Sequence, residues 1–211
     1  MILLPIQEAQ ATSMHQMAFQ GYKKQMEQRL EKGVKVDVRD KSGSTALHYA
    51  VLAKRVSVVE WLLDRGALID AADRSGNTPL LLAVQRGFVA IALRLISRGA
   101  DVNLVNRQLD SPLIGAGYHG DSGLVRILLD QGAEIDAKNT MGLTALHMAV
   151  MGGNSSVVKI LIDHGANVDA QDEDGETPLN KAKNPDLRAM LWESGARLEK
   201  KEDGALVGKS H

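Results

Sequence analysis

The 211-residue chain contains no cysteine, few aromatic residues and no long apolar run. Without cysteine it can form neither a disulfide nor a thiolate metal site, and it has no cysteine nucleophile. No stretch of about 18 apolar residues occurs, so we expect no membrane-spanning helix. Aromatic residues make up 3% of the chain, whereas hydrophobic residues together make up 44%. This composition predicts a core of aliphatic and small side chains.

Neither sign of charge dominates the chain. Lysine and arginine together number 25, aspartate and glutamate 26, and the net charge is −1. The basic residues are dispersed among acidic neighbours, whereas a nucleic-acid-binding protein is expected to carry a basic stripe. We therefore expect no nucleic-acid partner.

A period of 33 residues organises most of the chain. Thr45, Thr78, Ser111, Thr144 and Thr177 follow one another at this spacing, within stretches such as STALHYA and ETPLNKA. A Gly-Ala pair keeps the same spacing at residues 66–67, 99–100, 132–133 and 165–166, and its last copy, at 195–196, comes three residues early. Two independent markers in register indicate a repeat protein.

Each repeat is expected to contain two helices. Thr45 is a suitable N-cap for a short helix that carries Leu47 and Ala50. In the next unit Gly87 separates the first helix from a second, at 89–97, which Gly99 ends as a left-handed C-cap. A turn then leads into the next unit. Neither helix can bury its apolar side alone, so the units must stack.

These motifs resemble the ankyrin repeat, whose signature is T-P-L-H-x-A followed by G-A-D-V-N. The resemblance implies an all-α ankyrin-repeat solenoid, built from helix-turn-helix units with β-turn or hairpin tips. The expected divisions are an N-terminal segment at 1–12, a degenerate capping repeat at 13–39, repeats at 40–72, 73–105, 106–138 and 139–171, a C-terminal capping repeat at 172–198, and a disordered tail at 199–211.

Four positions depart from the repeat pattern. Lys54 replaces the glycine between the two helices, so it is expected in a backbone conformation that favours glycine. Leu109 replaces the glycine of the turn. The third repeat also carries Gly115 and Gly117 inside its first helix. Each glycine costs about 1 kcal/mol relative to alanine there, which predicts that this repeat is the softest.

Two motifs of enzymes occur in contexts that do not suit them. Residues 115–120 match G-x-G-x-x-G, but the repeat register places them in a helix and bend instead of after a buried strand. Ser156 and Lys159 match S-x-x-K without the companion motifs of the serine enzymes that use it. His48 and His147 hold the fourth position of T-x-L-H, where an imidazole links neighbouring turns. We expect no enzyme activity, no metal site and no cofactor.

The N-terminus allows two interpretations. Residues 1–6 read MILLPI, and Ala9-Gln10-Ala11 is a small-x-small triplet of the kind that precedes a signal-peptidase cut. One interpretation is a remnant of an export signal on a bacterial periplasmic protein, although the charged start is missing. The other is a frayed segment that packs Ile2, Leu3 and Leu4 onto the first helix. The first predicts a periplasmic location and the second leaves a cytoplasmic one open.

The resemblance implies that a partner protein binds the concave side, formed by the turn tips and the inner helices. The residues expected there are apolar, histidine or arginine side chains: Leu109, Tyr118, His119, Met141, Leu143, Met148, Met151, Arg74, Arg86 and Arg107. Apolar residues at tips that are normally polar predict an adaptable patch on the third and fourth repeats. The alternative is that Leu109 folds inward and that Met148 belongs to the stacking core.

The expected function is non-enzymatic protein binding by a chain that is monomeric on its own. In the periplasm such a module would mask or inhibit an enzyme, such as a cell-wall hydrolase that could harm its producer. The competing interpretation is a cytosolic adaptor or an effector directed at a host. Charge along the tips runs from basic, at Lys41, Arg74 and Arg107, to acidic, at Glu173 and Asp174. Such a gradient would orient a partner, and the alternative is that these residues are ordinary solvated turns.

Overall fold

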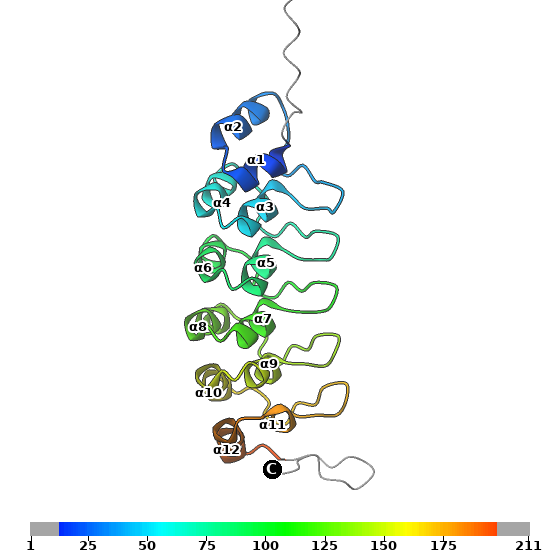
Figure 1. Ribbon diagram of the computed structural model, residues 1–211, viewed down its shortest axis with the longest axis vertical. Helices are drawn as coiled ribbons and strands as arrows, with labels where there is room; N and C mark the ends of the chain where they lie inside the picture. Colours follow the sequence, from blue (N-terminus) through cyan, green and yellow to red (C-terminus); the bar gives the residue numbers. More distant parts are fainter. Residues whose placement is uncertain (1–12, 198–211) are drawn as a thin grey trace, which may run out of the picture.

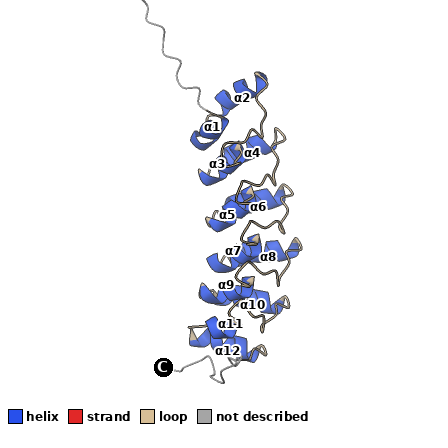
Figure 2. Cartoon of the chain, turned by 90° about the vertical axis from the view of Figure 1, so that its right-hand side faces the viewer, coloured by secondary structure: helices blue, strands red, loops and turns tan. Residues whose placement is uncertain are grey.

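The computed structural model describes residues 13–197, which form one elongated stack of helix pairs (Figures 1 and 2). Within that range there are twelve helices and no strand. The helices are α1 (Met14–Gln20), α2 (Lys23–Glu31), α3 (Ala46–Leu52), α4 (Val56–Leu63), α5 (Pro79–Gln85), α6 (Val89–Ser97), α7 (Pro112–His119), α8 (Ser122–Asp130), α9 (Ala145–Met151), α10 (Ser155–Asp163), α11 (Pro178–Lys181) and α12 (Pro185–Glu193).

The helix pairs stack in three parallel columns. The odd-numbered helices form an inner column, the even-numbered helices from α4 onward lie on one side of it, and the hairpin tips project on the other side (Figure 1). We use "inner surface" for the face formed by the tips and by the ends of the inner helices. The fold is the all-α solenoid that the 33-residue period predicts.

Equivalent leucines form the core of the stack. Each inner helix from α3 onward contributes one leucine two residues after its N-cap, and each of these is at most 1% exposed: Leu47, Leu80, Leu113, Leu146 and Leu179. Burying each of them contributes about 1.5–3 kcal/mol. Alanines three residues further on, such as Ala83 and Ala116, are also buried and let neighbouring inner helices approach closely. A ladder of leucine and alanine explains why the chain needs so few aromatic residues.

The hairpin tips are bonded both internally and to each other. In the second tip the side chain of Asp73 accepts hydrogen bonds from the backbone N–H groups of Ser75 (2.8 Å) and Asn77 (2.9 Å). Successive tips are joined by one backbone hydrogen bond each: Arg74 to Ser42 (2.8 Å), Arg107 to Ser75 (2.9 Å), Thr140 to Gln108 (2.8 Å) and Glu173 to Met141 (3.0 Å). The tips therefore form a continuous ladder without a regular strand.

Gly99 and Lys54 adopt the left-handed backbone that the sequence predicts, and Leu109 adopts it as well. Gly99 ends α6 with a φ of 88°, and the N–H of Ala100 then donates to the carbonyl of Leu95 (3.0 Å). Lys54 and Leu109 have φ values of 56° and 58°, in the left-handed region that favours glycine. Leu109 thus keeps the turn geometry of the tip glycines at the cost of backbone strain.

The last repeat has the shortest inner helix. α11 contains only four residues, because Ala182 is extended (ψ 110°) and Asn184-Pro185 already starts α12. Asn184 caps α12 by accepting a hydrogen bond from the N–H of Asp186 (2.8 Å). The predictions for residues 1–12 and for the tail at 199–211 lie outside the described residues.

Candidate functional site

Four large apolar side chains of the third and fourth repeats are about half exposed on the inner surface. Leu109 and Met141 are 47% and 57% exposed at their tips. Tyr118, near the end of α7, and Met151, at the end of α9, are 52% and 50% exposed. We call these four residues the apolar patch. Exposed methionine, tyrosine and leucine side chains lose unfavourable contact with water when a partner covers them.

Leu143 does not belong to this patch, and its prediction as an exposed contact residue is wrong. It is only 6% exposed, and its backbone N–H donates to the side-chain oxygen of Asn139 (3.0 Å). The residue directly before an N-cap lies at the base of the tip, not at its apex. Ser44, the equivalent residue of an earlier repeat, is buried as well. Leu109 is exposed, so it does not fold inward.

The three arginines that the sequence predicts for this surface are exposed. Arg74 and Arg107 lie at successive tips, where their backbone N–H groups form the inter-tip ladder, and Arg86 follows α5 as its C-cap. Within residues 13–197, none of the three takes part in an ion pair. Their guanidinium groups are therefore available to carboxylates of a partner.

His119 is exposed but bonded to the preceding repeat. Its Nε2 lies 3.1 Å from the carbonyl oxygen of Gln85, and its ring meets the ring of Tyr118 edge-on at 5.8 Å. His119 therefore supports the position of Tyr118 and does not itself extend freely toward a partner.

Two hollows adjoin the apolar patch, and neither follows from the repeat pattern alone. The third-repeat pocket, of about 240 Å³, lies between α5 and α7 and is lined by Tyr118, His119 and the half-buried Met148. The cap pocket, of about 440 Å³, lies between α9 and α11 beside Met151 and Lys183. Gly115 and the three-residue deletion in the last repeat were the available signals, because each removes atoms from the inner column.

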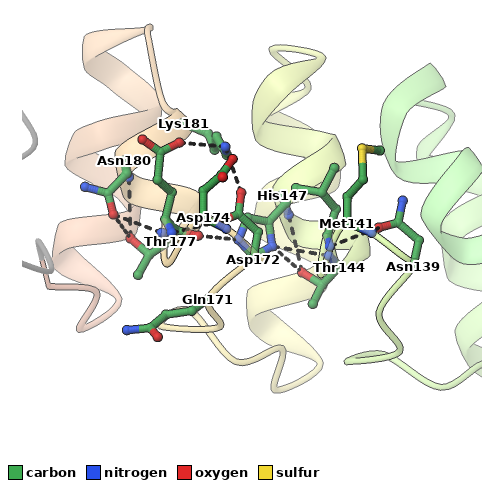
Figure 3. Close-up of polar contacts among 12 residues, drawn as sticks. Asn139, Met141, Thr144, His147, Gln171, Asp172, Asp174, Thr177, Asn180 and Lys181 are labelled. Atoms are coloured by element: carbon green, nitrogen blue, oxygen red, sulfur yellow. Dashed lines mark hydrogen bonds and ion pairs between the residues drawn. The ribbon is translucent and has the colours of Figure 1, made fainter. Parts of the chain in front are cut away.

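Buried threonine–histidine pairs hold the inner helices in register with the tips. The Nδ1 of His147 accepts the backbone N–H of Thr144 (3.2 Å) and lies 2.9 Å from its hydroxyl oxygen (Figure 3). Nε2 is then the protonated nitrogen, and it donates to the carbonyl of Glu176 in the next repeat (3.1 Å). His48 makes the same link to Asn77 (3.1 Å). These bonds confirm that the imidazoles connect neighbouring turns.

The enzyme-like motifs have structural roles. Residues 115–119 lie within α7, and Gly120 is its left-handed C-cap (φ 80°). Ser156 and Lys159 lie in α10, where the Nζ of Lys159 pairs with Asp163 one turn later (3.2 Å). Across residues 13–197, no group of three or more histidine, cysteine or acidic residues is arranged to hold a metal ion.

Comparison with protein families settles the relationship that the repeat suggests. A family model described as ankyrin repeats in three copies matches residues 14–106 and 113–202. The chain belongs to the ankyrin repeat family. Ankyrin repeats are protein–protein interaction modules and are generally non-enzymatic. No curated protein matches the chain.

The ankyrin stack carries a charge gradient along its tips. Lys41, Arg74 and Arg107 are exposed in the earlier tips, whereas Glu173 and Asp174 are exposed in the last one. None of the helices in the described part of this ankyrin protein is long and apolar enough to span a membrane. The apolar patch lies between the two ends of the gradient.

Proposed function

We propose that this ankyrin protein binds a partner protein, without catalysing a reaction, through the apolar patch on its inner surface. One observation carries the proposal: four large apolar side chains of two adjacent repeats are about half exposed on the inner surface. At the position of Met141 the other tips have Ser42, Ser75, Gln108 and Asp174. At the position of Leu109 they all have glycine. The two tip residues of the patch therefore depart from the repeat pattern. Tyr118 and Met151 share one repeat position, at which the earlier repeats have Leu52 and Gln85.

The geometry of the patch suits an interface centre. Large apolar and aromatic side chains at the centre of an interface supply most of its binding energy, and charged residues around them set orientation. The inter-tip hydrogen bonds fix Leu109 and Met141 relative to each other, because the N–H of Thr140 donates to Gln108. A partner would meet a preordered surface, which lowers the entropic cost of binding.

A capture experiment tests the proposal. The double variant Met141→Glu/Met151→Glu places two charges in the apolar patch at exposed positions, so the fold should be unaffected. Leu68→Glu is the matched control, because Leu68 is 58% exposed but lies outside the inner surface. We expect the wild type and Leu68→Glu to capture the same partner from the native organism, and the double variant to lose it. Capture of that partner by a folded double variant would refute the proposal.

We further propose that the module acts in the periplasm, where it masks or inhibits an enzyme such as a cell-wall hydrolase. The support is the Ala9-Gln10-Ala11 triplet after an apolar start, which lies outside the described residues. The alternative is a cytosolic adaptor or host-directed effector. Fractionation of native cells distinguishes them, and titration of the captured enzyme with the ankyrin protein should abolish its activity at a one-to-one ratio. An enzyme that stays active when saturated would refute inhibition.

A further inference from the structure

One position of the repeat reaches the polar base of the tip in the first and last full repeats, whereas Leu82 and Met148 hold it in the second and fourth. It is the fourth residue after the N-cap. In the first full repeat it is Tyr49, whose hydroxyl donates to a carboxylate oxygen of Asp40 (2.8 Å). In the last repeat it is Lys181, whose Nζ pairs with Asp172 (2.7 Å) and Glu176 (2.6 Å), as Figure 3 shows for Lys181 and Asp172. At both ends of the stack this side chain therefore satisfies the carboxylates of its own tip.

In the third repeat this position is Gly115, so no side chain is available. Asp110, which corresponds to Glu176, accepts amide hydrogen bonds from Asn139 (3.0 Å) and Asn106 (3.4 Å). Unlike Glu176, it has no cationic partner among the residues that the structure describes. A partly buried carboxylate without a counter-ion favours the arrival of a cation.

The third-repeat pocket lies where the missing side chain would be. Gly115 and Asp110 both line it. Its other walls include the apolar side chains of Leu81, Ile114 and Met148, with Tyr118 among the lining residues. An apolar wall with one carboxylate suits a side chain that has an aliphatic stem and a cationic end. An aromatic ring at the same site adds a favourable contact for the cation.

We propose that the third-repeat pocket binds one lysine or arginine side chain of the partner protein. Its charged end pairs with Asp110 in the way that Lys181 pairs with Glu176, and its stem lies against Leu81, Ile114 and Met148. This inference rests on the proposed function and specifies the chemistry of the partner's anchor. The exposed Arg74 and Arg107 on nearby tips disfavour a polybasic segment. The partner is therefore expected to present a single basic residue among neutral or acidic neighbours.

The test uses small probes, which need no knowledge of the partner. Nα-acetyl-lysine methylamide and its arginine analogue are titrated into the full chain at low ionic strength, with the norleucine analogue as the uncharged control. The methyl group of Met148 and the amides of Gly115 and Tyr118 are followed by NMR. We expect saturable shifts with both basic probes and about tenfold weaker binding of norleucine. Added salt should weaken only the basic probes.

Two variants locate the interaction. Asp110→Asn keeps the size of the side chain and should weaken lysine binding about tenfold. Gly115→Lys supplies the cation from within and should abolish probe binding. Its Cβ would lie 3.0 Å from a methyl carbon of Val84, a side chain that can shift. A Met148 methyl shift that moves toward the value of the probe-bound wild type, and no longer responds to the probe, shows a filled pocket. Amide shifts in α11 and α12 that match the wild type show that the protein is folded.

The inference is overturned if norleucine binds as tightly as lysine, if Asp110→Asn binds lysine like the wild type, or if the shifts concentrate at Glu173 and Asp174 instead. Those outcomes leave the proposed function intact, since it depends on capture by the apolar patch. Conversely, the proposed function is refuted if the Met141→Glu/Met151→Glu variant still captures the partner protein, even when the lysine probe binds.

Discussion

Single side chains decide how each repeat is joined to the next, and two of them can be titrated. Burial lowers the pKa of His48 and of His147 below the ordinary value of 6.5, although hydrogen bonds to Asn77 and Glu176 oppose this. Both imidazoles therefore bind a proton less readily in the folded chain than in the unfolded chain. Below about pH 6.5 the unfolded chain binds more protons than the folded chain does, so acid favours unfolding.

We predict that the free energy of unfolding falls as the pH decreases from about 6.5 toward the lowered pKa of these histidines. A second loss should follow below pH 3.8, because hydrogen bonds from Ser42 and Tyr49 outweigh burial and lower the pKa of Asp40 from 3.8 to about 2. Denaturant titrations at a series of pH values measure both steps.

The last repeat suggests a control for the loss of stability that begins near pH 6.5. There Asn180 replaces the histidine, and its side-chain oxygen accepts the N–H of Thr177 (2.9 Å). His48→Asn/His147→Asn should keep the caps, lose about 1 kcal/mol for each bond to the next repeat, and remove the loss of stability that begins near pH 6.5. A pH profile identical to that of the wild type would show that other groups cause the step.

Leu109 and Lys54 are non-glycine residues with a left-handed backbone. Glycine variants at these two positions distinguish an effect on stability from an effect on binding. Leu109→Gly should leave the fold unchanged or stabilise it by about 1 kcal/mol, because it relieves strain at a side chain that is half exposed. It should also weaken partner capture, because Leu109 belongs to the apolar patch. Lys54→Gly has similar backbone geometry outside that patch and should leave capture unchanged. Thermal unfolding and capture assays test both variants.

At the scale of the element, the glycines of α7 have a role that propensity alone does not reveal. Gly117 faces the first turn of α9, where an added Cβ would lie 2.6 Å from the carbonyl oxygen of Ala145. The glycine therefore permits a close contact between α7 and α9. The sequence predicts a soft third repeat from helix propensity, and hydrogen exchange in α7 compared with α5 and α9 still has to test that prediction.

We predict that Gly117→Ala destabilises the protein by about 2 kcal/mol, although alanine is the better helix former. Gly123→Ala, in the exposed face of α8, is the matched control. Its Cβ would meet only the side chain of Asp121 at 3.3 Å. The control should be neutral or stabilising in denaturant titrations. Equal effects of the two variants would contradict the close contact at Gly117.

The sequence predicts the role of a residue where the 33-residue period determines that role. Some roles follow from spacing because the residues recur at fixed positions of the repeat. Examples are the helix cap at Thr144, the core leucine at Leu146 and the helix end at Gly99. The burial of Leu143 and the third-repeat pocket do not follow from spacing. They depend on which way one side chain turns at the base of a tip and on what neighbouring repeats place against Gly115. The pocket joins residues 33 positions apart, such as Gln85 and Tyr118, so the pattern within one repeat does not determine it.

At the scale of the whole molecule, each repeat touches only its neighbours, so stability is approximately a sum of local terms. Lys181 tests this at the C-terminal end. Its partner Asp172 has a side chain that is 3% exposed, and the pair raises the pKa of Lys181 and lowers that of Asp172 against the opposing effect of burial. Removing the lysine leaves that buried carboxylate without its cation.

We predict that Lys181→Met lowers the free energy of unfolding by about 3 kcal/mol, whereas Lys159→Met, at an exposed pair with Asp163, changes it by less than about 0.5 kcal/mol. In hydrogen exchange, Lys181→Met should raise the rates in α11 and α12 first and leave α3 and α4 unchanged. A uniform increase along the stack would mean that the repeats unfold as one cooperative unit.

The contacts that join successive repeats also determine how the protein responds to force. A load applied along the stack passes through the contacts between repeats in series, so the weakest junction yields first while the others hold. Each released repeat of 33 residues adds about 110 Å of extended chain. Under tension the molecule would lengthen in nearly equal steps, one for each repeat that unfolds. On relaxation it would shorten again as the repeats refold.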